Sequence, residues 1–280
     1  MPELPEVETV RRLLQRALVG QKLVEVEVAP DEIVFEGAPP EAIVEALLGR
    51  TVTGAHRKGK AFWLAFDDAP WLFGHLGMAG WVRELGAGTI RLREHGEAPF
   101  EDEEGRPRFL KLRLVAENGA QIVLTDLRRL ARVWLGESAE SDEFVRGLGP
   151  DCLLEPATGK DLERRLAGRK APIKALLLDQ RLFAGVGNWI ADEVLYHARI
   201  DPRRPAGTLT TGELRRLAEA LSVIIQKAVD VGADSAQYPP EWLFHHRWGG
   251  GKGADTIGGR TLVREQVGGR TTAWVPGLQK

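Results

Sequence analysis

The segment Met1-Pro2-Glu3-Leu4-Pro5-Glu6-Val7-Glu8-Thr9 determines how the first domain starts. The apolar residues that follow recur at helical spacing as far as Leu18, which predicts an amphipathic helix. Pro5 suits the first turn of a helix, and the carboxylates beside it suit the positive amino-terminal end. The pattern therefore places Pro2 and Glu3 directly before a helix.

The sequence after this helix has the pattern of short strands, up to about residue 136. Residues 24–28 and 110–114 alternate between apolar and charged side chains, and other short apolar runs lie between and after them. One helix followed by many short strands predicts a β-sandwich. We therefore expect a β-sandwich domain over residues 1–136, with a helix at its start.

The rest of the chain has a different character. A polar linker over residues 137–156 precedes helical periodicity, which is clearest over residues 214–229. Beyond Gly232, glycine-rich breaks separate short apolar runs and predict a terminal β-hairpin at about residues 257–276. The sequence thus predicts an α+β fold whose second domain, residues 157–280, is helical and ends in a hairpin.

Charge and cysteine content limit the possible functions. The 280 residues carry a net charge of −2, which by itself argues mildly against a nucleic-acid partner. Basic residues nevertheless cluster at 128–132, 164–174 and 260–280, so a one-sided positive surface is compatible with the composition. The single cysteine, Cys152, excludes an internal disulfide and a metal site of several thiolates. Without a signal peptide or a long apolar run, we expect a cytoplasmic protein with no membrane association.

Five motifs carry a resemblance to a known family. They are the opening segment 1–9, Arg57-Lys58-Gly59-Lys60, His75-Leu76-Gly77-Met78-Ala79-Gly80, Thr125-Asp126-Leu127-Arg128-Arg129-Leu130, and Gly185-Val186-Gly187-Asn188. Together they resemble the formamidopyrimidine-DNA glycosylases, the Fpg branch of the Fpg/Nei family. The resemblance implies a helix-two-turn-helix second domain and a bifunctional DNA glycosylase and AP lyase of base-excision repair. Its partner would be double-stranded DNA with a damaged base or an abasic site. We expect a monomer, nucleoid-associated in a bacterium or nuclear in a eukaryote.

Pro2 is the candidate nucleophile. Removal of Met1, which is common before a small residue such as proline, leaves a free secondary amine that can attack C1′ of a nucleotide. The resulting Schiff base permits elimination of the 3′ and then the 5′ phosphate, without a metal or another cofactor. Glu3 is the candidate for proton transfer at the sugar ring, and Glu6 is a supporting carboxylate.

Other site residues are assigned by the resemblance. Lys60 is expected to bind the phosphate beside the target nucleotide. Met78, Arg128 and Leu130 are expected to fill the gap that remains when a nucleotide is flipped out of the duplex. Leu130 stands where the family usually has an aromatic residue, so we expect weaker stacking there.

The carboxyl-terminal part departs from the common family pattern. Most members end in a four-cysteine zinc finger, whereas residues 268–276 resemble the zincless finger of plant-type members, a hairpin that presents Arg270 to the DNA backbone. Lys170 and Asn188 correspond to further phosphate contacts. Residues 235–248 replace the loop that covers 8-oxoguanine in zinc-finger relatives. We therefore expect formamidopyrimidines and hydantoins to be better substrates than 8-oxoguanine.

Three alternatives remain open at this level. The first is a Nei-like specificity for oxidised pyrimidines, against which the Leu4-Pro5 start argues. The second is a non-catalytic module that binds damaged DNA, against which Pro2, Glu3 and Lys60 argue. A metal-dependent nuclease is the third.

Overall fold

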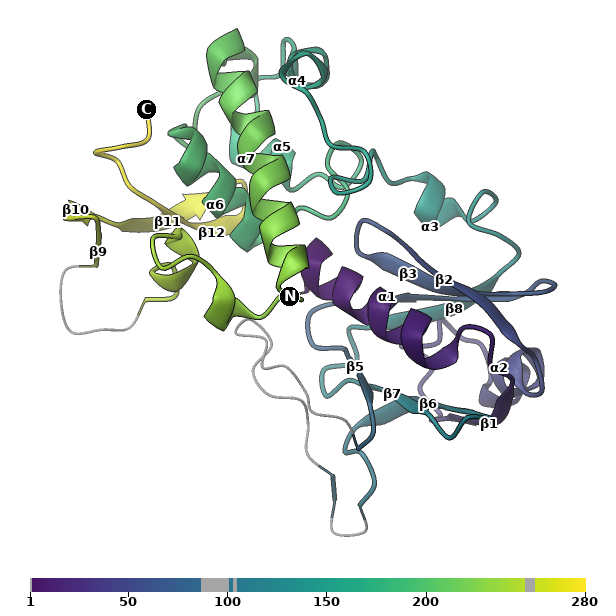
Figure 1. Cartoon of the computed structure of the whole chain (residues 1–280). Helices are drawn as coiled ribbons and strands as arrows, with labels where there is room; N and C mark the ends of the chain where they lie inside the picture. The colour runs from purple at the N-terminus through teal and green to yellow at the C-terminus, as the bar shows by residue number, and fades with distance from the viewer. Residues whose placement is uncertain (1, 87–100, 103–104, 250–254) are drawn as a thin grey trace. The chain divides into compact units, whose positions relative to one another are not determined.

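The computed structural model describes residues 2–86, 101–102, 105–249 and 255–280 (Figure 1). The chain divides into two compact units, one of residues 1–147 with 232–234 and the other of residues 148–231 with 235–280. Among the described residues, no helix is both long and apolar enough to cross a membrane.

The first unit is a β-sandwich with two helices. Its elements are α1 (Leu4–Leu18), β1 (Leu23–Val28), α2 (Pro40–Leu47), β2 (Val52–Lys58), β3 (Ala61–Phe66), β4 (Trp71–His75), β5 (Trp81–Glu84), β6 (Leu110–Ala116), β7 (Gln121–Thr125), β8 (Arg132–Gly136) and the short α3 (Glu143–Arg146). One sheet has the strand order β1-β6-β7-β5 and the other β2-β3-β4-β8, with all neighbours antiparallel. Helix α1 packs against β2, β3 and β5 (Figure 1).

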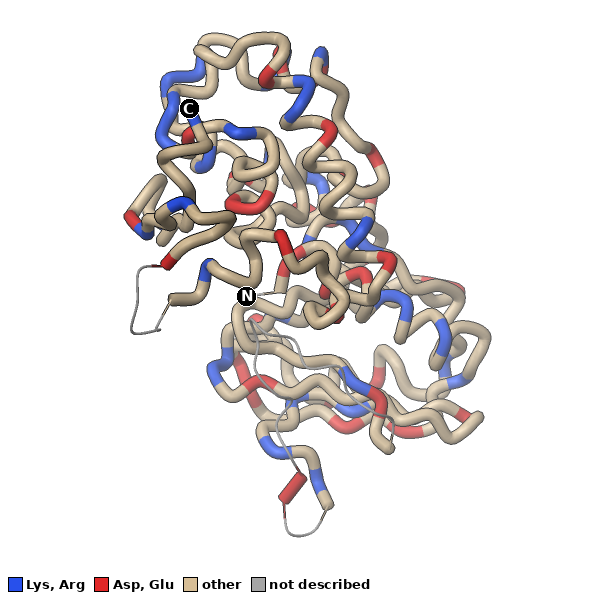
Figure 2. The backbone as a smooth tube through the Cα atoms, turned by 60° about the vertical axis from the view of Figure 1, so that its left-hand side comes forward, with Lys and Arg blue, Asp and Glu red and all other residues tan. Residues whose placement is uncertain are grey.

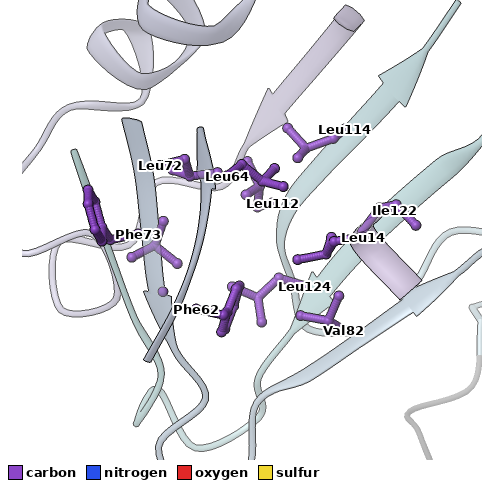
Figure 3. A pocket seen from close by; sticks show the side chains of 12 residues that line it. Leu14, Phe62, Leu64, Leu72, Phe73, Val82, Leu112, Leu114, Ile122 and Leu124 are labelled. Carbon is purple, nitrogen blue, oxygen red and sulfur yellow. The ribbon is translucent and has the colours of Figure 1, made fainter. Parts of the chain in front are cut away.

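The core of this unit lies between the sheets and under α1. Alternate apolar residues of the strands meet one face of the helix there, as the period-two and helical patterns predict. A cavity of about 30 Å³ lies in this layer, lined by side chains such as Leu14, Phe62, Leu72 and Leu124 (Figure 3). An apolar cavity of this size lacks the polar groups that hold a buried water, so it is part of the core packing and not a ligand site.

The second unit is helical and ends in a hairpin. Its elements are α4 (Gly159–Leu166), α5 (Ile173–Leu177), α6 (Asn188–Ala198), η1 (Ala206–Thr208), α7 (Thr211–Asp230), η2 (Ser235–Gln237), η3 (Leu243–His245), β9 (Thr256–Ile257), β10 (Arg260–Thr261), β11 (Val263–Val267) and β12 (Arg270–Trp274). Helix α7 packs against α4 and α6, and α6 also packs against β12. Strands β11 and β12 pair from Val263 with Trp274 to Val267 with Arg270. The turn between them is Gly268-Gly269, where φ angles of +61° and +78° favour glycine.

The predicted α+β class, the amino-terminal helix and the terminal hairpin are confirmed. Asn188 is the first residue of α6. One local expectation changes. The polar stretch expected as a linker contains α3, because the Asp142 side chain accepts the backbone N–H of Val145 at 2.8 Å and caps this helical turn.

Candidate functional site

Two buried carboxyl groups lie at the start of α1, next to Pro2. Glu3 is the residue that caps the helix, and its backbone N–H donates to Oε2 of Glu6 at 2.9 Å in a capping-box arrangement. Both side chains are buried, as is Pro2. Burial, together with the nearby charge of Glu3, raises the pKa of Glu6 from 4.5 to about 7. A carboxyl group with this pKa can both donate and accept a proton at neutral pH.

The raised pKa of Glu6 predicts a pH-dependent stability. Because the folded-state pKa lies above the ordinary value of 4.5, the native state binds more protons than the unfolded state between these values. This contribution is complete below pH 4.5 and is lost as the pH rises through about 7. Across that window we expect the wild-type free energy of unfolding to fall by up to about 3 kcal/mol relative to a Glu6→Gln variant.

Urea unfolding over a pH series measures this difference. Glutamine can replace glutamate in a capping box, so the variant should remain folded. Glu41→Gln, in the first turn of α2, is the matched control, because that glutamate is exposed. Parallel pH profiles for the wild type and Glu6→Gln would contradict the assigned pKa.

Lys60 lies in the turn between β2 and β3 and is only 9% exposed, so it is not an ordinary solvated charge. Arg57, near the end of β2, stabilises this turn, because its Nη1 donates to the carbonyl oxygen of Gly59 at 3.0 Å. The Arg57 Nε in turn donates to the Glu8 carboxylate at 3.1 Å. Glu8 thus has a structural partner of its own. This contact is consistent with leaving Glu8 outside the predicted catalytic set.

His75 is the last residue of β4 and the first residue of the third motif, and no role was predicted for it from the sequence. Burial, together with the positive charges of Lys60 and Arg132, lowers the pKa of His75 to about 4. Its Nδ1 accepts the backbone N–H of Gly77 at 3.0 Å, so the neutral ring carries its proton on Nε2. The His75 ring is therefore a neutral N–H donor, and it lies close enough to Lys60 for the lysine charge to lower the pKa of the ring. Its place at the start of the motif His75–Gly80 was the sequence signal for it.

The loop that carries Met78 lies against the loop that carries Leu130. At Gly77, where φ is +58°, a Cβ atom would lie 2.0 Å from the carbonyl oxygen of Leu130. Met78 is 40% exposed between Gly77 and Gly80, and Arg128 is exposed on the neighbouring loop. The structure thus brings together the three residues that were predicted to fill the gap in the duplex.

Asp126 organises the second of these loops. Its Oδ1 accepts the N–H of Arg128 at 2.9 Å, and its Oδ2 accepts the N–H groups of Leu130 and Ala131, each at 2.7 Å. The buried carboxylate therefore fixes the backbone around Arg128. Sequence reasoning missed this role, although an aspartate before a turn is a known signal for such contacts.

The most exposed apolar side chain of this loop is Leu127, at 61%, whereas Leu130 is half-buried. Leu127 was not singled out from the sequence. Its place next to the fixed Asp126 makes it a further apolar group on the surface where Met78 and Arg128 are exposed. Nothing in the sequence distinguished Leu127 from a leucine of the core.

In the second unit, Lys170 and Arg270 are exposed, and Asn188 opens α6. Acidic and basic positions are interspersed in both units (Figure 2). Within the described part of the chain, however, the side chains of Arg128, Lys170 and Arg270 form no ion pair. The neighbouring Arg129, in contrast, is paired with Asp31 at 3.0 Å. These three basic residues, all predicted to contact DNA, are therefore available to an anionic ligand.

The segment 235–248 is folded around aromatic side chains and a buried carboxylate. Glu193 of α6 accepts the N–H groups of Leu243 at 3.0 Å and Phe244 at 2.7 Å. Burial raises the pKa of Glu193. Trp189 and Tyr238 pack with Trp242 and Phe244 beside these contacts. The segment is thus held to α6 by polar and aromatic contacts.

Comparisons with known proteins agree with this architecture. The sequence profile of the formamidopyrimidine-DNA glycosylase N-terminal domain matches residues 1–133, and that of the formamidopyrimidine-DNA glycosylase H2TH domain matches residues 148–257. The formamidopyrimidine-DNA glycosylase of Arabidopsis thaliana is 40% identical over 280 residues, covering 100% of this chain and 71% of the relative. The enzyme of the same name from Pelobacter propionicus is 32% identical over 288 residues and covers 100% of both chains.

Solved structures give the same result. The Lactococcus lactis formamidopyrimidine-DNA glycosylase, bound to DNA with an AP site, has a TM-score of 0.81 at 27% identity over 99% of both chains. Both halves of the chain thus match one class of protein, the DNA glycosylases of base-excision repair. The chain belongs to the formamidopyrimidine-DNA glycosylase family.

Proposed function

We propose that this chain is a bifunctional glycosylase and AP lyase that removes oxidised purines through a Schiff base at Pro2. The observation that carries the proposal is the buried pair of Glu3 and Glu6 beside Pro2, with the pKa of Glu6 near 7. Family membership supports the same chemistry. We propose that the chain acts as a monomer, in the bacterial nucleoid or the eukaryotic nucleus.

In this mechanism, the Pro2 nitrogen attacks C1′ as the bond to the damaged base breaks and the base leaves with a proton. Glu3 donates a proton to the ring oxygen O4′, and the C1′–O4′ bond opens to give an iminium ion. Loss of the C2′ proton expels the 3′ phosphate, and a second elimination expels the 5′ phosphate. Water then releases the sugar fragment from Pro2. Glu6, with its pKa near 7, can supply and receive protons for Glu3 at neutral pH.

The ligand of this site is double-stranded DNA with a damaged base or an abasic site. Structures of relatives were solved with an AP site, with a carbocyclic 8-oxo-G and with an oxidised pyrimidine in the DNA. In this chain, Lys60 would bind the phosphate next to the lesion. Met78, Arg128 and Leu130 would fill the gap in the duplex. Lys170, Asn188 and Arg270 would bind backbone phosphates.

Borohydride reduction tests the covalent step. Incubation of the protein with an abasic-site duplex and borohydride should yield a stable protein–DNA adduct, and strand cleavage should continue in EDTA. DNA binding without an adduct would favour a non-catalytic module. Cleavage abolished by EDTA would favour a metal-dependent nuclease.

Lesion preference is a separate prediction. Because residues 235–248 form an aromatic segment held by Glu193, we expect the site to lack the contacts of the 8-oxoguanine loop of zinc-finger relatives. Single-turnover excision of formamidopyrimidines and hydantoins should exceed that of 8-oxoguanine by about tenfold or more, which is the size of one missing contact. An undamaged duplex is the control. A faster rate on 8-oxoguanine would refute this order, and a faster rate on oxidised pyrimidines would favour the Nei-like alternative.

A further inference from the structure

One buried carboxylate, Asp192 of α6, joins three separate segments of the second unit. It is 1% exposed, and its Oδ1 accepts a hydrogen bond from Nζ of Lys174 in α5. Its Oδ2 accepts two hydrogen bonds, one from Nη2 of Arg247 at 2.8 Å and one from the backbone N–H of Ala273 in β12 at 3.2 Å. The same Lys174 Nζ lies 3.3 Å from the carbonyl oxygen of Thr271, to which it donates. We call Lys174, Asp192 and Arg247 the Asp192 cluster.

Two further contacts fix the same hairpin. Nδ2 of Asn188, one turn before Asp192 on α6, donates to the carbonyl oxygen of Thr271 at 3.0 Å. At the tip, a Cβ atom on Gly268 would lie 2.7 Å from Cβ of Ala175, so the turn lies directly on α5. The exposed Arg270 lies between these two anchor points.

The hairpin also has contacts outside the Asp192 cluster: Nε of Arg264 donates to the carbonyl oxygen of Arg247 at 2.9 Å, and the Arg203 guanidinium lies 4.3 Å from the ring centroid of Trp274. A two-stranded ribbon is marginally stable by itself, and the apolar cluster under this one is small: Leu243, Ile257, Leu262, Ala273 and Val275. The single cysteine of the chain excludes the four-thiolate finger of other family members. A buried carboxylate is costly unless it is paired and hydrogen-bonded. The Asp192 cluster therefore favours one position of β12 relative to α6, which apolar contacts alone would not specify.

We propose that Asp192 is a positioning residue for DNA binding: its cluster fixes β12 so that Arg270 and Asn188 form a pre-arranged pair of phosphate contacts. In this chain the ionic cluster takes the role that a metal-bound finger has in relatives with four cysteines. The inference rests on the proposed phosphate contact of Arg270.

The salt dependence of DNA binding tests this proposal. Affinity for a duplex with a tetrahydrofuran abasic-site analogue is measured over a series of salt concentrations. Arg270→Ala removes one phosphate contact, so the slope of log affinity against log salt should fall in magnitude by about 0.9. Asp192→Asn should reduce the slope by the same amount, although it touches no DNA. The double variant should show no further reduction, because both changes remove the same contact.

Asp161→Asn is the matched control. It makes the same change of charge in the same unit, on a carboxylate of α4 that pairs with Arg164 and lies outside the cluster. Its slope should equal that of the wild type. If Asp192→Asn has the wild-type slope and only a lower melting temperature, or if its effect adds to that of Arg270→Ala, the proposal is wrong.

A second variant covers the case in which Asp192→Asn does not fold. Replacement of the whole cluster by apolar residues of similar size, Lys174→Met with Asp192→Leu and Arg247→Met, removes the buried charges together and is commonly tolerated. The folded triple variant should also lose about 0.9 of the slope, and a wild-type slope would overturn the inference. If Arg270→Ala itself leaves the slope unchanged, the proposed DNA contact of Arg270 has failed, and the role of Asp192 in positioning it fails with it. A reduced slope for Arg270→Ala beside a wild-type slope for Asp192→Asn refutes the role of Asp192 alone.

Discussion

A protein that retains any residue ahead of Pro2 should lose base excision and strand cleavage by at least about 10³-fold, because the nucleophile becomes an amide nitrogen. An amide has no available lone pair and cannot form an iminium ion. Two added amino-terminal residues that survive processing provide this change. Single-turnover assays on a formamidopyrimidine duplex measure it, and intact-mass measurement establishes which amino terminus each preparation carries.

Pro2→Gly is the control for this experiment. Once Met1 is removed, glycine also presents a free terminal amine, so borohydride should still trap this variant on an abasic site at a reduced rate. The extended protein should give no adduct. An adduct with the extended protein would show that an amine other than that of Pro2, either a lysine or the new terminal amine, forms the Schiff base, and Lys60 would then be the first side chain to replace.

Glu3→Gln should reduce base excision by about 10²- to 10⁴-fold, which is the usual contribution of a positioned general acid or base. The amide has nearly the same shape but cannot deliver a proton to the ring oxygen. A preformed abasic site already exists partly as the open aldehyde, so its Schiff base requires less help from Glu3. The loss should therefore be larger on a base-bearing lesion than on an abasic site.

The ratio between those two substrates separates catalysis from folding. A purely structural defect at the start of α1 would reduce both rates equally. Glu41→Gln, the same change in the exposed first turn of α2, should leave both rates unchanged. Equal losses on both substrates with Glu3→Gln would argue that Glu3 only caps the helix.

The local patterns predicted much of the fold. The α1 helix and the alternating strands follow from contacts within a few residues of the chain. Local rules gave no sign of α3, because a single capped turn carries too little periodicity to be distinguished from a polar linker.

The candidate site was predictable only in part. Pro2, Glu3 and Glu6 lie within five residues, so the sequence could bring them together. The sequence could not show that burial raises the pKa of Glu6, because the groups that exclude water come from elsewhere in the fold. Leu127 and Leu130 are equally apolar in the sequence, and only the turn held by Asp126 makes the first the more exposed.

The sequence by itself determined the family and the absence of a four-cysteine finger, and it predicted Pro2 as the nucleophile, because all three depend on residue identity at fixed positions. Only the tertiary structure decided what holds the hairpin in place of such a finger. Lys174, Asp192 and Arg247 are far apart in the chain and meet only when α5, α6 and the segment after η3 pack together. Buried charges pair across whatever elements the fold brings into contact, and no local spacing rule encodes that choice.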